Sequence, residues 1–131
     1  GWVVLGSESG FKAAVDTGVA WSLSQINASG GTAVIGGLAD ELGWSHRRLI
    51  RRYRDAVGLS PKLVARIVRF ERLTSRVASE PVIDWAAAAA DCGYFDQAHL
   101  AREVRELADI TPTELRAQVV NSVQDDVVGS A

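Results

Sequence analysis

The stretch Gly43-Trp44-Ser45-His46-Arg47-Arg48-Leu49-Ile50-Arg51-Arg52-Tyr53-Arg54 decides how this chain folds. It follows a short helical pattern and carries five arginines within positions 47–54. Ser45 suits the N-cap position, where a hydroxyl accepts hydrogen bonds from the first free backbone N–H groups of a helix. We therefore expect a second, arginine-rich helix to open directly after Ser45.

The two faces of this second helix differ in chemistry. Leu49, Tyr53 and Ala56 fall at helical spacing and make one apolar face. The opposite face carries Ile50 and a set of arginines, namely Arg47, Arg51 and Arg54. Such a helix packs on a core with one side and offers guanidinium groups to a polyanion with the other. The pattern is typical of a recognition helix in the major groove of DNA.

Charge is concentrated in the middle of the chain. The net charge of the 131 residues is −2, but residues 44–79 hold ten basic and two acidic residues, a net charge of +8. The segments on either side, 1–43 and 80–131, carry net charges of −3 and −7. Because phosphate neutralisation depends on the local field, the overall acidity does not exclude nucleic acid as a partner.

Composition bounds the protein class. With 47% hydrophobic residues, the chain is long enough for one good core or two small ones. No apolar run approaches the roughly 20 residues of a membrane span, and no signal-peptide pattern occurs. The single cysteine fits a reducing cytoplasm. Because the chain has no methionine and starts at Gly1, we expect it to be part of a longer protein.

Helix signals follow one another along the chain, and no strand pattern does. A first helix should start near Asp16 or Thr17 and end at Ser29-Gly30-Gly31, and Thr32 should cap the next one, to about Leu42. The remaining predicted helices are residues 45–57, 61–78, a segment from Asp84 to Gly93, 96–108, and a short one after Thr111-Pro112. Residues 119–131 read as a polar, frayed tail. The fold class is all-α, with about seven helices.

The helix predicted for residues 61–78 is the longest, at roughly 27 Å. Its apolar stripe comprises Leu63, Ile67, Phe70 and Val77. A basic stripe lies beside it and comprises Lys62, Arg66, Arg69, Arg72 and Arg76. Arg69 is also open to a structural role as an internal tie, because an acidic residue, Glu71, lies nearby.

The chain contains an internal repeat. At an offset of 51 residues, Ser45 aligns with Asp96, Leu49 with Leu100, Arg51 with Arg102, Arg54 with Arg105 and Ser60-Pro61 with Thr111-Pro112. Upstream the offset is 50, which pairs Gly43 with Gly93 and Ala39 with Ala89. The second turn therefore holds one extra residue. Two helix-turn-helix units joined by the 61–78 helix explain this pattern.

Over roughly residues 17–118 the chain resembles the C-terminal DNA-binding domain of an AraC/XylS-type transcription regulator. The residues that carry the resemblance are LADELGWSHRRLIRRYRDAVGLSP at 38–61 and CGYFDQAHLAREVRELADITPTELR at 92–116. Arg69-Phe70-Glu71 stands where that family has Arg-Leu-Glu. The resemblance implies a first unit at about 17–58, a linker helix at 61–78 and a second unit at about 82–118, between an N-terminal remnant (1–16) and a C-terminal tail (119–131).

The resemblance also implies that recognition helices 45–57 and 96–108 enter successive major grooves of double-stranded DNA, about 34 Å apart. The implied base contacts are Arg47, Arg48, Ile50 and Arg51 in the first unit and Ala98, His99 and Arg102 in the second. The implied phosphate contacts are Arg52, Arg54, Ser60, Lys62, Arg105 and Thr111, including backbone N–H groups at the helix starts. Promoter or operator DNA and RNA polymerase are the implied partners.

The second unit departs from the family pattern. Glu103 and Glu106 oppose Arg102 and Arg105, and Asp109 stands where the family has glycine. We therefore expect residues 45–57 to supply most of the affinity and the second unit to add selectivity. The resemblance further implies a sensor or dimerisation domain that residues 1–16 are too short to form, a cytoplasmic location (on the nucleoid when bound), and neither catalysis nor a cofactor.

Two other functions compete with DNA regulation. A helical protein-interaction module would use the basic face for an acidic partner. A DNA-repair enzyme fragment would need an activated cysteine with a base partner, whereas we expect Cys92 to be a buried inert thiol. We expect the aromatic residues Trp44, Tyr94 and Phe95 to pack in cores or turns, and no metal site, since neither His46 nor His99 has partners at ligand spacing.

Overall fold

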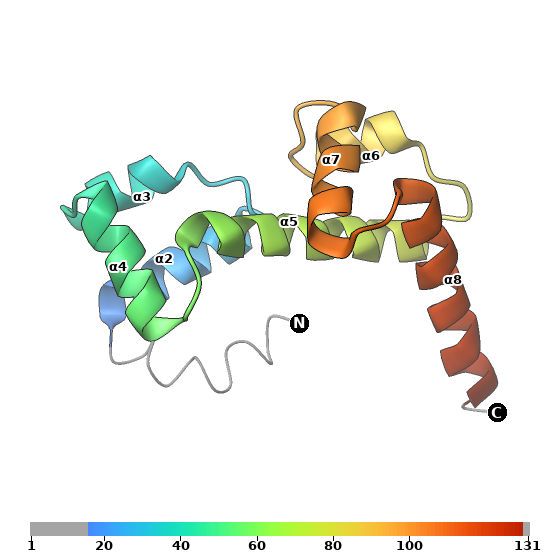
Figure 1. Cartoon of the computed structure of the whole chain (residues 1–131), viewed down its shortest axis with the longest axis horizontal. Helices are drawn as coiled ribbons and strands as arrows, with labels where there is room; N and C mark the ends of the chain where they lie inside the picture. The colour runs from blue at the N-terminus through green and yellow to red at the C-terminus, as the bar shows by residue number, and fades with distance from the viewer. Residues whose placement is uncertain (1–15, 130–131) are drawn as a thin grey trace. The chain divides into compact units, whose positions relative to one another are not determined.

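A computed structural model describes residues 16–129 of the chain, with side chains as far as Ser122. Seven helices and no strand occur in this range, which confirms the all-α class (Figure 1). They are α2 (Thr17–Ala28), α3 (Ile35–Leu42), α4 (His46–Ala56), α5 (Pro61–Ser79), α6 (Trp85–Asp91), α7 (Gln97–Ala108) and α8 (Pro112–Gly129). The expected N-terminal remnant lies outside the described residues except for Asp16.

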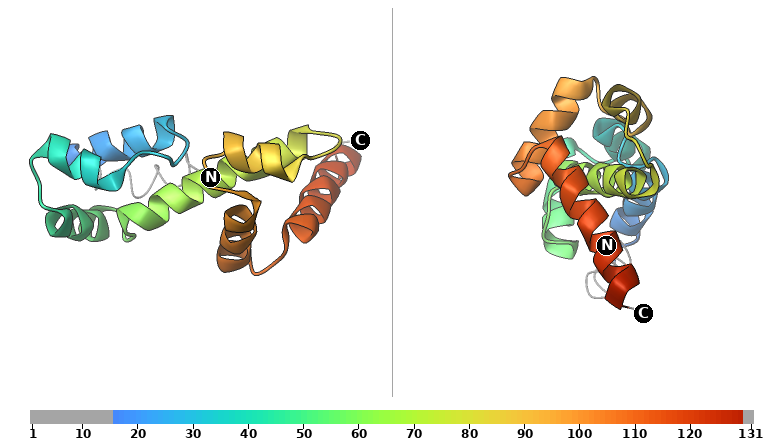
Figure 2. Two further views of the ribbon diagram at one scale, coloured as in Figure 1. Left: turned by 90° about the horizontal axis from the view of Figure 1, so that it is seen from above. Right: turned by 90° about the vertical axis from the view of Figure 1, so that its right-hand side faces the viewer.

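The chain divides into two compact units, and the boundary falls inside α5, between Arg69 and Phe70. In unit 1, α4 packs against both α2 and α3; in unit 2, α7 packs against both α6 and α8 (Figures 1 and 2). Each unit has its own hydrophobic core. Helix α5 contributes Val64 and Val68 to the first core and Leu73 and Val77 to the second. The linker helix therefore belongs to both cores.

The apolar stripe expected on α5 was partly wrong. Val77 is buried as expected, but Leu63, Ile67 and Phe70 are only half-buried. Val64, Val68 and Leu73 take the buried positions instead. Apolar residues occupy both 63–64 and 67–68, so helical periodicity cannot choose between the two stripes. Packing against the other helices makes that choice.

Unit 1 is closed by a tight approach between the α2–α3 connection and α5. Gly31 has a φ of 83°, and a Cβ there would lie 2.3 Å from the carbonyl oxygen of Ala65. Only glycine allows this approach. The Arg69 guanidinium donates to the Gly31 carbonyl oxygen at 3.0 Å, so Arg69 ties α5 to the α2–α3 connection, a structural role through a partner that the sequence did not indicate.

Two predicted helix boundaries were wrong. Helix α3 starts at Ile35 after Val34, because the Thr32 N–H and the Ala33 N–H both donate to the Ser29 hydroxyl, which closes a turn before the helix. Helix α8 is not short: it has 18 residues and runs through most of the segment expected to be a frayed tail. Among the described helices, none is both long and apolar enough to cross a bilayer.

Candidate nucleic-acid interface

The turn between α3 and α4 has the geometry that its sequence predicts. Gly43 ends α3 in the left-handed conformation, with φ 69°. The Trp44 N–H donates to the Ala39 carbonyl oxygen at 2.9 Å, and the Ser45 hydroxyl accepts from the Arg48 N–H at 3.1 Å. The predicted cap is thus confirmed, and it fixes where α4 begins.

The inner face of α4 is anchored by Tyr53. Tyr53, Leu49 and Ala56 are buried as predicted. The Tyr53 hydroxyl hydrogen-bonds the buried Ser22 hydroxyl, which itself donates to the Val19 carbonyl oxygen at 3.0 Å. Burial raises the pKa of Tyr53 to about 12, against the smaller lowering effect of the Ser22 hydrogen bond. This contact fixes the rotation of α4 relative to α2.

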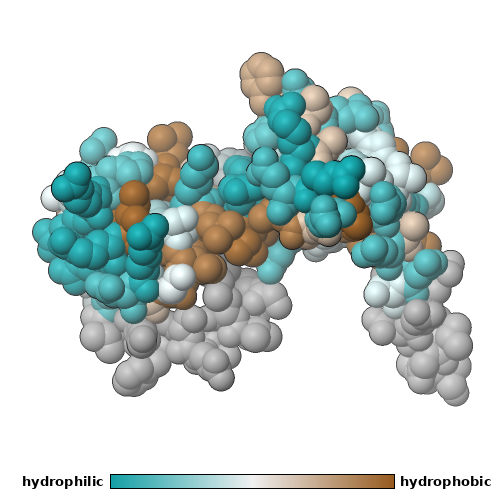
Figure 3. Space-filling view, in the orientation of Figure 1, coloured by the Kyte–Doolittle hydropathy of each residue, from teal (hydrophilic) through white to brown (hydrophobic). Residues whose placement is uncertain are grey.

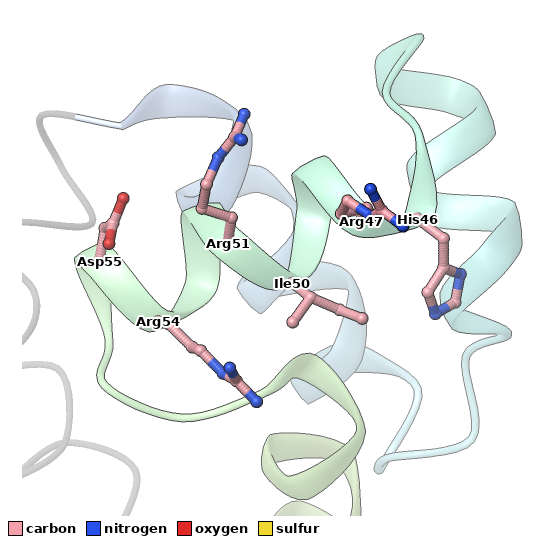
Figure 4. Close-up of a pocket in the computed structure, with 6 residues that line it drawn as sticks. All are labelled: His46, Arg47, Ile50, Arg51, Arg54 and Asp55. Atoms are coloured by element: carbon pink, nitrogen blue, oxygen red, sulfur yellow. The ribbon is translucent and has the colours of Figure 1, made fainter.

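The outer face of α4 is exposed and basic. His46, Arg47, Ile50, Arg51, Arg54 and Asp55 line one open hollow on the surface (Figure 4). Arg47, Arg51 and Arg54 are exposed, and Ile50 is half-buried among them. Hydrophilic residues cover the end of unit 1 that carries α3 and α4 (Figure 3). The structure thus places four of the predicted contact residues on one surface.

Arg48 and Arg52 lie on a separate flank of α4. Their Cζ atoms lie 5.1 and 5.4 Å from the centroid of the Trp44 ring, within cation–π range. The Arg52 guanidinium also forms an ion pair with Asp16, at 3.3 Å between Nη1 and Oδ2. Sequence reasoning missed both contacts, because Trp44 was expected only to pack and Asp16 only to cap α2.

The turn between α6 and α7 repeats the first turn. Gly93 has φ 86°, and the Tyr94 N–H donates to the Ala89 carbonyl oxygen at 2.9 Å. The Asp96 carboxylate caps α7 by accepting from the His99 N–H at 2.7 Å. Ala89, Leu100 and Val104 are buried at the positions that match Ala39, Leu49 and Tyr53. These matches confirm the repeat that the sequence offset indicates.

The outer face of α7 differs from that of α4. Ala98 and Arg102 are exposed and His99 is half-buried. The His99 Nδ1 atom accepts from the Phe95 N–H at 3.1 Å, which leaves Nε2 to carry the hydrogen and donate. Two expectations were wrong here. Glu103 is 4% exposed and so lies in the interior and not on the outer face beside Arg102, and Phe95, the extra residue of the turn, is 93% exposed and does not pack.

Some of the residues predicted to contact phosphates already make hydrogen bonds or ion pairs within the protein. The Ser60 hydroxyl caps α5 by accepting from the Leu63 N–H at 3.2 Å, and its own hydrogen can still be donated. The Thr111 hydroxyl accepts from the Glu114 N–H, which caps α8, and its own hydrogen is donated to the Glu114 carboxylate. Lys62 is exposed. The Arg105 guanidinium lies 4.0 Å from the Asp109 carboxylate, with both side chains mostly exposed.

Arg76 and Cys92 have structural roles in unit 2. Arg76 was expected on the basic stripe of α5, but it pairs with Asp91 and with Glu80, the latter at 2.7 Å, and so ties α5 to α6. Burial raises the pKa of the Cys92 thiol, although the positive charge of Arg76 opposes this. An activated thiol needs a lowered pKa. Within residues 16–129, His, Cys, Asp and Glu form no cluster of three that could hold a metal ion.

Comparison with known proteins assigns the chain to a family. The sequence profile of a family described as a helix-turn-helix domain matches residues 38–118. No curated protein sequence matches this chain.

Solved structures share the fold. One is a probable AraC family transcriptional regulator from Rhodopseudomonas palustris CGA009, with 24% identity, a TM-score of 0.64, and coverage of 79% of this chain and 97% of that one. Another is the xylose-binding transcription activator xylR, with 19% identity and a TM-score of 0.61 over 77% of this chain. The match spans 27% of that activator's length.

The family profile covers both turns and both arginine-bearing helices described above. The chain therefore belongs to the AraC-type helix-turn-helix family, and it is a DNA-binding domain of a transcription regulator.

Proposed function

We propose that this domain binds double-stranded DNA sequence-specifically, with α4 and α7 entering successive major grooves. The observation that carries the proposal is the division of α4 into a buried face, which fixes its rotation, and an exposed face of three arginines around Ile50. Arginine forms bidentate hydrogen bonds with the O6 and N7 atoms of guanine. Arg47 and Arg51 are the main base-contacting residues, and Ile50 contacts a thymine methyl group or fills space.

The second unit contributes selectivity through α7. Ala98, His99 and Arg102 take the base-contacting positions, and Arg102 is the only arginine among them. Arg54, Lys62 and Arg105 contact phosphates, which position the protein without reading sequence. Backbone N–H groups at the starts of α5 and α8, next to Ser60 and Thr111, add to these contacts.

The wider regulatory role is also part of the proposal. A companion domain that senses a ligand or mediates dimerisation acts together with this one, and RNA polymerase is the partner at the promoter. The support for both is membership of the AraC-type family.

Selection of bound duplexes from a random pool tests the proposal. We expect an enriched motif with at least one guanine whose replacement weakens binding as much as Arg47→Ala or Arg51→Ala does, about 10- to 100-fold. Lys62→Ala is the control, because loss of a phosphate contact weakens all duplexes alike and lowers the salt slope by about 1. A pool without an enriched motif would contradict sequence-specific binding and favour a module that binds acidic partners.

A further inference from the structure

Trp44 lies in the turn of the first unit, where it contacts α2 and two arginines of α4. The benzene edge of its indole rests on the bare backbone of Gly18 in α2, and a Cβ at Gly18 would lie 2.5 Å from the Trp44 Cη2 atom. The Trp44 backbone is fixed by its hydrogen bond to Ala39. The ring is therefore held at both ends, by the turn and by α2.

This fixed ring orders two arginines of α4. Arg48 and Arg52 are one helical turn apart, and both guanidinium groups lie within about 5.4 Å of the ring centroid. The Asp16 carboxylate holds Arg52 from a second side, and the same carboxylate caps α2 through the Val19 N–H at 3.1 Å. Gly18, Trp44 and Asp16 thus restrict side chains that would otherwise sample many rotamers.

The position of Arg48 and Arg52 on α4 favours phosphates over bases. At about 100° per residue, Arg48 and Arg52 lie on the flank of the helix and not on the face formed by Arg47 and Arg51. When the centre of a helix faces the bases in the major groove, its flanks face the sugar–phosphate backbone. An ordered guanidinium fork loses less conformational entropy when it binds a phosphate.

The second unit shows the same relationship between the turn and the recognition helix. Tyr94 follows Gly93 as Trp44 follows Gly43, and His99 occupies the position that matches Arg48. The Tyr94 and His99 rings make an edge-to-face contact with centroids 5.3 Å apart. In both units, an aromatic residue of the turn contacts the side chain at this position of the recognition helix.

We propose that Trp44 is a positioning residue for DNA binding, which holds Arg48 and Arg52 in place for phosphates of one strand. This rests on the proposed function, and it moves Arg48 from the base contacts to the phosphate contacts. Trp44 itself does not contact DNA.

A double-mutant cycle on the selected duplex tests the proposal. Trp44→Leu keeps an apolar side chain over Gly18 but removes the aromatic face. We expect it to raise Kd about three- to tenfold in the wild-type background. The Arg48→Ala/Arg52→Ala variant should lower the salt slope by about 2, and adding Trp44→Leu to it should change Kd less than about twofold. A general packing defect would instead weaken binding equally in both backgrounds and overturn the proposal.

Two controls separate positioning from folding. Trp21→Leu removes a half-buried tryptophan that packs on the core of the same unit, and its folded form should bind within about twofold of wild type. Trp44→Phe keeps a smaller aromatic face, so its loss of affinity should fall between wild type and Trp44→Leu. Circular dichroism melts check that each variant is folded at the titration temperature. If Trp44→Leu is unfolded at that temperature, the affinity of Trp44→Phe takes its place in the test.

The possible failures are distinguishable. A wild-type chain that enriches no duplex contradicts the proposed function and this proposal together. A wild-type chain that enriches a duplex, while Trp44→Leu and Trp44→Phe bind it equally well, contradicts the role of Trp44 alone.

Discussion

Helices α4 and α7 share a scaffold but differ in the surface they present. In both, the turn has a left-handed glycine, a side-chain cap follows, and the leucine at the matching position is fully buried. Outside the core, α4 carries five arginines, whereas α7 carries two. The core and the turn therefore fix where each of these helices lies in its unit, while the exposed residues set its charge independently.

The largest expected effect tests whether the two units are separately stable. Leu49→Ala and Leu100→Ala each leave a cavity in one core and should cost about 2–5 kcal/mol. Because each core is local, Leu49→Ala should lower hydrogen-exchange protection mainly in α2–α4, and Leu100→Ala mainly in α6 and α7. Exchange measured by mass spectrometry checks this. A uniform loss across both units in either variant would show that α5 couples them into one cooperative unit.

Alkaline pH should act on unit 1 through Tyr53, which has only Val104 as its counterpart in unit 2. The folded-state pKa is raised from 10.0 to about 12, so the neutral phenol stabilises the fold below pH 10. As pH rises from 10 through about 12, up to about 2–3 kcal/mol of this stability should be lost.

Urea unfolding of Tyr53→Phe beside wild type measures this effect. The variant should lose about 1 kcal/mol at pH 7, because the Ser22 hydroxyl loses a hydrogen-bond partner. The difference in unfolding free energy between the two proteins should then shrink above pH 10. A difference that stays constant up to pH 12 would contradict the raised pKa.

The next effect tests the asymmetry in DNA affinity. Arg51→Ala should cost about 1–3 kcal/mol of binding free energy on the selected duplex, and Arg102→Ala should cost less. The reason is the smaller positive charge of α7, where Glu106 and Asp109 remain exposed although Glu103 is buried. Titrations at several salt concentrations separate the two variants. Equal losses would refute the assignment of most of the affinity to residues 45–57.

The smallest effect concerns the left-handed residue that follows α4 and the one that follows α7. Gly58 has φ 84°, and its counterpart Asp109 has φ 59°, a left-handed conformation that costs a residue with a Cβ about 1 kcal/mol. Asp109→Gly should therefore stabilise unit 2 by up to about 1 kcal/mol in thermal unfolding. Gly58→Ala is the matched reverse change, because a Cβ there meets no atom within 4 Å and only the backbone strain is added. The two substitutions should change the free energy of unfolding in opposite directions. A Gly58→Ala variant that is more stable than wild type would contradict the backbone strain.

Local signals allowed much of the fold to be predicted. The predicted cap Ser45 accepts the expected backbone hydrogen bond, and Ser60, Asp84, Asp96 and Thr111 accept equivalent bonds where the sequence predicts helix starts, because a cap depends on residues within one turn. The faces of α4 were also predictable, since its polar and apolar residues separate cleanly at helical spacing. Thr32 is the exception. It does not cap α3, because the backbone N–H groups of Thr32 and Ala33 donate to the Ser29 hydroxyl and form a separate turn before the helix.

The candidate interface was only partly predictable. Arg47, Ile50, Arg51 and Arg54 were expected on one surface and lie together there. Glu103 is buried and Phe95 is exposed, the reverse of what their polarity indicates, because polarity along the chain does not reveal which neighbours cover a side chain. The partners of Arg76 are four to fifteen residues away, and only the packing of α5 and α6 brings Asp91 to it.

Sequence alone predicted the seven helices, the cap Ser45, the two-unit repeat and the arginine-rich face, since each depends on spacings of a few residues or on one fixed offset, although it misplaced the start of α3 and the length of α8. Tertiary structure was needed to show which stripe of α5 is buried, that Tyr53 bonds Ser22, and that Trp44 lies between Gly18 and two arginines. The contacts of Gly18 with Trp44, Ser22 with Tyr53 and Asp16 with Arg52 join residues 26 to 36 positions apart in the chain. Helical periodicity fixes the direction of a side chain from its own axis, and only the packing of helices determines what it meets.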